Sequence, residues 1–307
     1  MKYSIEEFMD MLRYCRPGGS QTELEFIEKY LEPLDVSYDD YGNIYKFVGN
    51  SRVMWSCHTD TIHSKDGMQE LHFEQGFVYS KDRNCLGADC TTGVWLMVNM
   101  IRAGVPGIYI FHRDEETGMR GSSHIAKTYG NELAQHIDYA VAFDRYGYDS
   151  IITHQMFERG CSQAFTDSLA GILDMDFKAD DGGVYTDTYS YIDIISECTN
   201  ISVGYFSQHT MKERQDILFA ETLVQKLMRF DESKLVSKRD PSVKEVSEDD
   251  WVKQYYDRMY KSDDDEIWGM ADVVRMYPEE AAKILLDYGV TEDDIMGTRV
   301  HSRRQLG

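Results

Sequence analysis

Acidic and histidine residues recur in this sequence close to the ends of apolar runs. Glu115 and Glu116 lie in the stretch FHRDEETGMRGS (111–122), just after the apolar run 107–111. Comparable positions, at the end of an apolar run or the start of a helical pattern, are held by His58 with Asp60, by Asp89, by Asp144 and by His209. A single Glu-Glu pair is usually a solvated turn, so the chemical interest of this pair lies in the residues that share its setting.

These residue types suit a metal centre. Open α/β sheets bind ligands in the crevice beyond the carboxyl ends of their strands, so one crevice could collect all of these side chains. Imidazole nitrogens and carboxylate oxygens suit zinc, manganese or cobalt. Two His and three carboxylates exceed what one tetrahedral catalytic zinc needs, whereas two metals sharing a carboxylate would use them all. Ions about 3.5–4 Å apart can activate a bridging water and polarise a scissile carbonyl, as in aminopeptidases.

Two acids remain for other roles. Glu115 is the extra acid beside the ligand set and could act as the general base on the water. Asp60 lies two residues after His58 on an extended segment, so the two side chains point to the same side. A metal-bound imidazole usually donates its second N–H to a carboxylate or carbonyl, and Asp60 is the candidate acceptor.

Strand-length apolar runs alternate with helical periodicity along most of the chain. Strands are predicted at 44–48, 53–58, 107–111, 139–143, 151–154 and 199–206, and a hairpin at 71–81. Helices are predicted at 5–12, 20–31, 90–101, 122–129, 161–172 and 212–230. Ser20 and Glu23 can form a capping box at the start of the second helix. The alternation predicts an α/β fold, with a central mixed, mostly parallel sheet flanked by helices.

Composition restricts the partners. The 54 acidic and 32 basic residues give a net charge of −22, which repels nucleic acid and anionic membranes, so neither is expected to bind. No apolar run reaches the roughly 20 residues that span a bilayer, and the N-terminus does not have the continuous apolar stretch of a secretory signal. The six cysteines form no CxxC pair. We therefore expect reduced thiols, no thiolate zinc cluster and a cytoplasmic location.

The motifs resemble those of the di-zinc exopeptidase superfamily, which includes the bacterial leucyl and glutamyl aminopeptidases and a carboxypeptidase and deacylase branch. The matching motifs, in the same order over about residues 1–230, are His58-Thr59-Asp60, Gly87-Ala88-Asp89, the stretch 115–122, Asp144 and Ser207-Gln208-His209-Thr210. The resemblance implies two divalent metal ions per chain, Zn²⁺ first, with Co²⁺ or Mn²⁺ as alternatives.

The resemblance also divides the ligands between the two ions. It implies that Asp89 bridges them. The remaining ligands would be His58 and Asp144 at one ion, and Glu116 and His209 at the other. Glu115 would be the base and Asp60 would orient His58. One departure is Cys90, which stands where many relatives have a second Asp after a peptide bond that is often cis. We expect the site to persist, with altered hydrogen bonding around it.

Domain organisation follows from the same comparison. Only 64 residues separate Asp144 from His209, too few for the dimerisation domain of the carboxypeptidase and tripeptidase branches. The resemblance therefore favours a single di-metal exopeptidase catalytic domain over residues 1–232. Residues 233–307 are predicted to form an acidic linker, with Lys238-Arg239-Asp240-Pro241 in it, and a short helical C-terminal extension that docks on the core or binds a partner.

Several other residues keep open interpretations. Asp187 and Tyr185 belong either to a solvated loop or to the wall that faces the substrate. The cysteines nearest the motifs are interpreted as structural thiols: Cys57, Cys85 and Cys90. Six histidines are not needed by the metal site and are interpreted as surface or packing residues: His63, His72, His112, His124, His136 and His154.

The sequence predicts a metal-dependent exopeptidase, foremost an aminopeptidase acting on peptides or amino-acid amides, with a homo-oligomer as an option. One alternative is a carboxypeptidase or amide deacylase with the same metals. It would need an inward-pointing cation for the substrate carboxylate, for which the candidates are Arg113, Arg145 and Arg214. The alternative from another class is an inactive binding protein on this scaffold. Glu115 argues against it, because a binding protein needs no general base.

Overall fold

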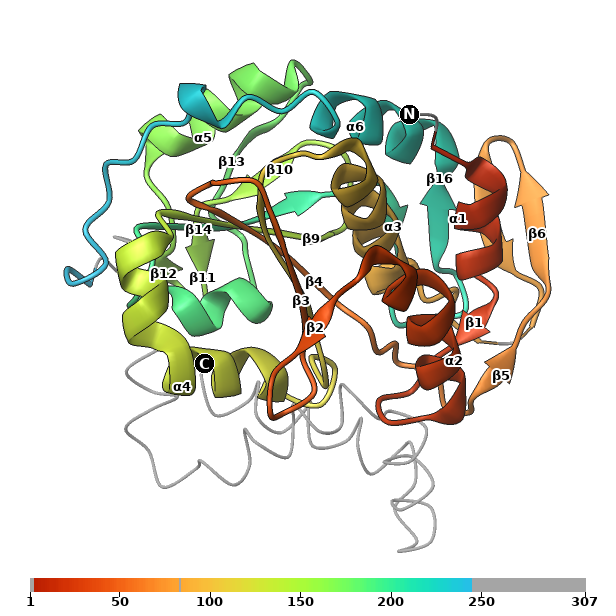
Figure 1. The fold of residues 1–307 in the computed structure, drawn as a ribbon. Helices are drawn as coiled ribbons and strands as arrows, with labels where there is room; N and C mark the ends of the chain where they lie inside the picture. Colours follow the sequence, from red (N-terminus) through yellow and green to blue (C-terminus); the bar gives the residue numbers. More distant parts are fainter. Residues whose placement is uncertain (1–2, 83, 245–307) are drawn as a thin grey trace, which may run out of the picture. The chain divides into compact units, whose positions relative to one another are not determined.

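A mixed sheet of eight strands forms the centre of the computed structural model, which describes residues 3–82 and 84–244. The strand order is β13-β10-β14-β9-β4-β8-β3-β2 (Figure 1). The bounds, in that order, are Lys178–Asp180, Ser150–Ile152, Glu197–Ser202, Tyr139–Arg145, Val53–His58, Gly107–His112, Ile44–Val48 and Ser37–Tyr38. The four central strands β14, β9, β4 and β8 are parallel, whereas β10, β3 and β2 join antiparallel to their inner neighbours. The predicted mixed, mostly parallel sheet is confirmed.

Alternate residues of the central strands pack on opposite faces of this sheet. Trp55, Tyr109 and Phe143 belong to the larger hydrophobic core on one face, whereas Met54 and Ile110 belong to a smaller core on the other. Because both faces are covered, a central strand is apolar along most of its length, and β4 is buried at every position. Because a buried strand is mostly apolar, the polar residues that follow it show in the sequence where the strand ends.

Helices cover both faces of the sheet, as predicted. The larger core is packed by α1 (Ile5–Met11), α2 (Gln21–Tyr30), α3 (Ala88–Ala103), α5 (Gln163–Leu173) and α6 (Ile217–Leu227). The smaller core is packed by α4 (Arg120–His136) and the 3₁₀ helix η2 (Asp187–Tyr191). Figure 1 shows α4 on the opposite side of the sheet from α5 and α6. Ser20 caps α2 by accepting from Glu23 N at 3.2 Å, and the Glu23 carboxylate accepts in return from Gly19 N at 2.7 Å.

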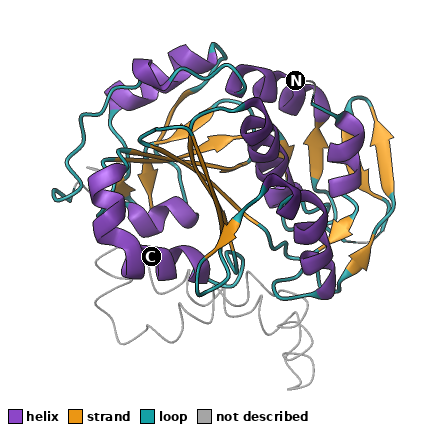
Figure 2. Cartoon of the chain, viewed as in Figure 1, coloured by secondary structure: helices purple, strands orange, loops and turns teal. Residues whose placement is uncertain are grey.

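A second, antiparallel sheet has the order β15-β16-β7-β6 and lies beside the central one (Figure 2). Its strands are Tyr205–Phe206, Arg214–Asp216, Phe77–Ser80 and Leu71–Glu74. The predicted hairpin is confirmed, and its turn residues Gln75 and Gly76 both have positive φ. Shorter elements complete the description: β1 (Tyr14–Cys15) paired with β5 (Gly67–Met68), β11 (His154–Gln155) paired with β12 (Glu158–Arg159), η1 (Glu32–Leu34) and η3 (Glu232–Lys234).

Three predicted elements are wrong in part. The strand expected at 151–154 is divided into β10 and β11, and β11 pairs with β12. The helix expected at 212–230 begins only at Ile217, because residues 214–216 form β16 and Asp216 caps the helix by accepting from Phe219 N at 3.0 Å. The strand expected at 199–206 is divided into β14 and β15 around Gly204, whose φ is 89°. In all three cases a short strand pairs outside the central sheet, and local periodicity does not report such pairing.

The chain between η3 and residue 244 lies against the body of the fold. Leu235 is buried in the larger core, and the Arg239 side chain donates to the carbonyls of Ile192, Ile195 and Ser196. The predicted C-terminal helical extension falls on residues 245–307, outside the described residues. None of the helices in the described part of the chain is both long and apolar enough to cross a membrane.

Candidate metal centre

The predicted site residues converge at the carboxyl ends of the parallel strands. His58 is the last residue of β4, Glu115 and Glu116 follow β8, and Asp144 lies near the end of β9. Two further residues arrive from outside these strands: Asp89 at the start of α3, and His209 in the loop between β15 and β16. Parallel strands end at one edge of the sheet, so the polar residues at the ends of these three strands lie close together.

His58 lies between three acidic residues. Its Nε2 is 3.0 Å from Asp89 Oδ1 and 3.6 Å from Asp144 Oδ1. Its Nδ1 is 2.9 Å from the backbone carbonyl oxygen of Asp60 and 3.4 Å from Asp60 Oδ1. The carbonyl of Asp60, more than its carboxylate, therefore fixes the orientation of the ring, which leaves Nε2 directed at the acids.

Asp89 joins the two histidines. Its Oδ2 is 3.3 Å from His209 Nε2, which is also 3.1 Å from Glu116 Oε1. Potential ligand atoms of Asp89, Glu116 and His209 lie within 4.8 Å of one another, and the same holds for His58, Cys90 and Asp144. The structure thus brings together one triad that contains Asp89 and a second that contains His58, and His58 also forms a third group with Glu115 and Glu116. The peptide bond between Asp89 and Cys90 is cis, and the Cys90 thiol donates to the carbonyl of Phe143 at 3.1 Å.

The Asp60 carboxylate supports the neighbouring loop. It accepts from the backbone N–H groups of Glu115 at 3.2 Å and Glu116 at 3.1 Å. The Glu115 side chain reaches the site, with Oε2 4.0 Å from His58 Nε2, and it forms no hydrogen bond with another described residue. The Asp60 carboxylate therefore fixes the backbone that carries the Glu115 and Glu116 carboxylates.

Three residues that hold Asp144 were not identified from the sequence. Thr186 Oγ1 donates to its Oδ2 at 2.7 Å, and the Tyr205 hydroxyl donates to its Oδ1 at 3.1 Å. Asn200 Nδ2 donates to the Asp144 carbonyl oxygen at 2.7 Å. Thr186 and Tyr205 lie in a loop and a two-residue strand, where no local pattern indicates their direction. Their bonds place Asp144 beside His58.

Glu213 is a further buried acid at the site that the sequence did not single out. Its carboxylate accepts from the backbone N–H groups of Leu86, Gly87 and Asp89 at 2.8, 2.9 and 3.2 Å. Burial raises its pKa to about 7, and the charge of Asp89 adds to the shift. Glu213 lies just before β16, in the stretch predicted as a helix. Because that prediction is wrong there, it does not indicate that Glu213 points inward.

The charges at the site favour a bound cation. Six carboxylates gather around two imidazoles, and within the described residues no Lys or Arg donates to any of the six: Asp60, Asp89, Glu115, Glu116, Asp144 and Glu213. Burial raises the pKa of Asp144 to about 7, and the charge of Asp89 adds to it. Burial opposes a charge on His209, but the charge of Glu116 and the hydrogen bond with Asp89 outweigh it and raise the pKa to about 12. The donor set fits divalent metals, because hard oxygens and imidazole nitrogens surround a place that attracts positive charge.

The three candidate arginines all have partners away from the site. The Arg113 guanidinium is 2.7 Å from Glu23 Oε2, and that of Arg145 is 3.1 Å from Asp180 Oδ2. The Arg214 guanidinium lies over the Phe206 ring, 4.9 Å from its centre. The structure therefore provides no contact between these cations and the ligand set.

The remaining candidates are mostly packing residues. Asp187 is 1% exposed, and its Oδ2 is 3.1 Å from His112 Nδ1 without hydrogen-bond geometry, so it does not line an open loop. Tyr185 is exposed. His112 and His63 are buried, as their interpretation as packing residues requires. All six cysteines are buried and free, including the three nearest the site.

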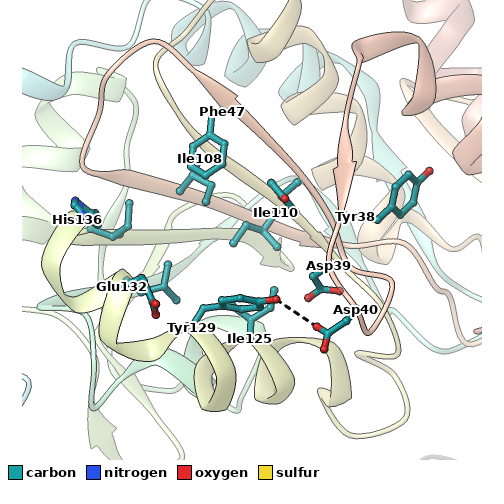
Figure 3. A pocket seen from close by; sticks show the side chains of 13 residues that line it. Tyr38, Asp39, Asp40, Phe47, Ile108, Ile110, Ile125, Tyr129, Glu132 and His136 are labelled. Carbon is teal, nitrogen blue, oxygen red and sulfur yellow. Dashed lines mark hydrogen bonds between the residues drawn. The ribbon is translucent and has the colours of Figure 1, made fainter.

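A separate apolar pocket of about 400 Å³ lies between α4 and the strands β3 and β8 (Figure 3). Its apolar wall includes Phe47, Ile108 and Ile110, and Tyr129 donates to Asp40 at its rim. None of its lining residues belongs to the ligand set. The candidate metal centre and the pocket are therefore distinct.

Comparisons with known proteins bear on the fold. No protein-family model and no curated protein sequence matches this chain. Solved structures do match. A tripeptidase from Staphylococcus aureus has a TM-score of 0.60 at 14% identity, covering 73% of this chain and 95% of its own. Aminopeptidase PepT from Bacillus cereus has a TM-score of 0.58 at 14% identity, with the same coverage. The TET1 peptidase of Pyrococcus horikoshii has a TM-score of 0.58 at 15% identity, covering 74% of this chain and 100% of its own. The chain has the α/β fold of these aminopeptidases and tripeptidases.

Proposed function

We propose that the protein is a metal-dependent exopeptidase, specifically an aminopeptidase. The observation that carries the proposal is the position of Asp89, whose two carboxylate oxygens face His58 and His209 at 3.0 and 3.3 Å. Each histidine has a second acid beside it, Asp144 and Glu116 respectively. One bridging carboxylate with a His–carboxylate pair on each side is a donor arrangement that could hold the two ions of a two-metal hydrolase.

The same residues indicate which metal ions the site would hold. Asp89, His58 and Asp144 would bind one divalent ion, and Asp89, Glu116 and His209 a second, with Zn²⁺ proposed ahead of Co²⁺ or Mn²⁺. When bound, such ions supply a water of lowered pKa and polarise the scissile carbonyl. The protein contributes rigid placement, since His58, Asp144 and Asp89 each have fixed partners.

Glu115 is proposed as the general base. Its carboxylate lies 4.0 Å from His58 Nε2 and within 4.8 Å of potential ligand atoms of His58 and Glu116. It does not belong to the group of Asp89, Glu116 and His209 or to that of His58, Cys90 and Asp144. Burial raises its pKa well above the usual range, which suits a group that must accept a proton and then release it. Glu115 would take a proton from the attacking water and pass it to the leaving amine. Asp60 would keep this carboxylate in place through the Glu115 backbone.

The charge of the site favours an aminopeptidase over a carboxypeptidase or deacylase. A substrate carboxylate needs a cation to receive it, and Arg113, Arg145 and Arg214 are engaged with other residues. The cluster of acids suits a free N-terminal amine instead. We therefore expect hydrolysis of peptides and amino-acid amides with a free amino terminus.

The direct test is a calorimetric zinc titration of chelator-treated protein, followed by matched substrates. Two sites per chain are expected, together with cleavage of an aminoacyl anilide and no cleavage of the corresponding N-acyl amino acid. One site per chain would contradict the ligand assignment. Preference for the N-acyl amino acid would favour the deacylase. No metal binding by folded protein would favour the inactive binding protein.

Assembly is a separate part of the proposal. The Pyrococcus horikoshii TET1 peptidase can assemble into a tetrahedron or a large octahedral shell. We propose a homo-oligomer for the present chain, with the number of copies to be measured by light scattering. A monomer at micromolar concentration would contradict this part and leave the metal centre untouched.

A further inference from the structure

Glu213 occupies an unusual position beneath the bridging residue. It is 2% exposed, and its Oε2 accepts from the N–H groups of Leu86 and Gly87 while its Oε1 accepts from that of Asp89. Successive backbone N–H groups that converge in this way form an anion-binding concavity. Here the anion is the side chain of Glu213, which follows Asp89 by 124 residues in the sequence.

The turn that Glu213 holds is also confined on its other side. Gly87 has a φ of 71°, and a side-chain carbon there would approach His63 Cε1 to 2.7 Å. The His63 ring is itself fixed, because Nδ1 accepts from the Thr61 hydroxyl at 2.7 Å and Nε2 donates to the Cys85 carbonyl at 3.1 Å. The backbone that carries Asp89 is thus clamped between a rigid ring and a buried carboxylate.

Glu213 also connects the two metal triads. It lies four residues after His209, and its own N–H donates to the carbonyl of Thr210 at 3.0 Å. The segment 209–213 therefore carries a proposed ligand at one end and the anchor of the bridging ligand at the other. A displacement of Glu213 would disturb His209 and Asp89 together.

We propose that Glu213 is a positioning residue that holds the Asp89 carboxylate in register with both His58 and His209. The inference rests on the proposed function, since it concerns the same metal centre. Glu213 touches neither substrate nor reacting atoms. It acts through the backbone of Leu86 to Asp89.

A glutamine at this position tests the role with almost no change of shape. The amide has one oxygen and one NH₂ group, so at least one of the three backbone N–H donors would face another donor. Glu213→Gln should weaken zinc binding at both sites roughly tenfold to a hundredfold, as loss of residues that orient ligands does elsewhere. The visible absorption of the Co²⁺-loaded protein, which reports ligand geometry, should change as well.

Glu197→Gln is the matched control. Glu197 is also fully buried and accepts from the N–H groups of Ser162, Lys238 and Arg239, but it lies at the opposite end of β14 from the site. It should lower the melting temperature and leave zinc affinity, stoichiometry and the cobalt spectrum as in the wild type. Should Glu213→Gln not fold, Glu213→Asp, which keeps the charge and shortens the reach, is expected to fold and to show the same changes to a smaller degree.

The outcomes separate the inference from the function. Suppose that the wild type binds two metals and that folded Glu213→Gln has the same zinc affinity and cobalt spectrum. That result would overturn the positioning role. If only Glu213→Asp folds, the same result in that variant would overturn it. Equal loss of affinity in Glu197→Gln would overturn it too, because any buried carboxylate would then have the same effect. If the wild type bound no metal, the proposed function would fail first and the inference with it.

Discussion

The carboxylate of Asp60 and the backbone of Glu116 are joined by a hydrogen bond of 3.1 Å, with the adjacent Glu115 N–H donating to the other carboxylate oxygen at 3.2 Å. This pair of bonds connects the exit of β4 to the loop after β8. The residue expected to orient a histidine thus also fixes the backbone of the proposed base, Glu115, and of one proposed ligand, Glu116.

Asp60→Asn should therefore lower kcat more than it lowers metal affinity. The variant amide can accept through one oxygen only, so one of the two loop N–H groups loses its partner and the Glu115 carboxylate shifts. We expect kcat to fall roughly tenfold to a hundredfold. Steady-state kinetics and a parallel zinc titration check this. Unchanged kcat would show that the loop does not depend on Asp60.

Glu115→Gln should nearly abolish turnover and leave zinc binding close to that of the wild type. General-base catalysis contributes roughly a hundredfold to ten-thousandfold, and the amide cannot take the proton. The measurement is kcat on an aminoacyl anilide beside calorimetric stoichiometry. Loss of a metal site in this variant would identify Glu115 as a ligand, and the proposed base would then be wrong.

Asp89→Asn should weaken both metal sites together. Its two oxygens face different histidines, so replacing one oxygen by NH₂ and removing the charge affects both triads. Zinc titration should show both affinities reduced. His209→Ala is the comparison, since it is expected to weaken one site more than the other. A loss confined to one site in Asp89→Asn would contradict the bridging role.

His63 should make stability depend on pH between about 6.5 and 4. Burial, aided by the charge of Arg16, lowers its pKa to about 4 in the folded protein. The unfolded chain binds the proton at higher pH, so the free energy of unfolding is highest above pH 6.5 and falls as the pH drops toward 4, by up to about 3 kcal/mol. His63→Gln retains a donor and an acceptor but does not titrate. Denaturant unfolding at several pH values should show a shallower decline for the variant, and an equal decline would exclude His63 as the source.

Much of the site could be predicted because it lies at the ends of fully buried strands. The runs before His58, Glu115 and Asp144 are apolar for structural reasons, and the first polar residues after them mark the edge of the sheet. The residues that were missed reach the site from elements without such a signature. Tyr205 comes from a two-residue strand, and Glu213 from a stretch whose long-range pairing with β7 overrides a helical pattern.

The buried carboxylate of Glu197 affects how the chain should respond to proteases. Lys238 and Arg239 form a dibasic pair in a polar stretch, an apparent target for trypsin. Their backbone N–H groups donate to Glu197, and the Arg239 side chain is bound to three carbonyls. A protease must extract this backbone before it can cut, so nicking at 238–239 should be slow in the native protein. A chain shortened at residue 232 would remove the Lys238 and Arg239 donors from a buried charge, whereas one ending at 244 would keep them.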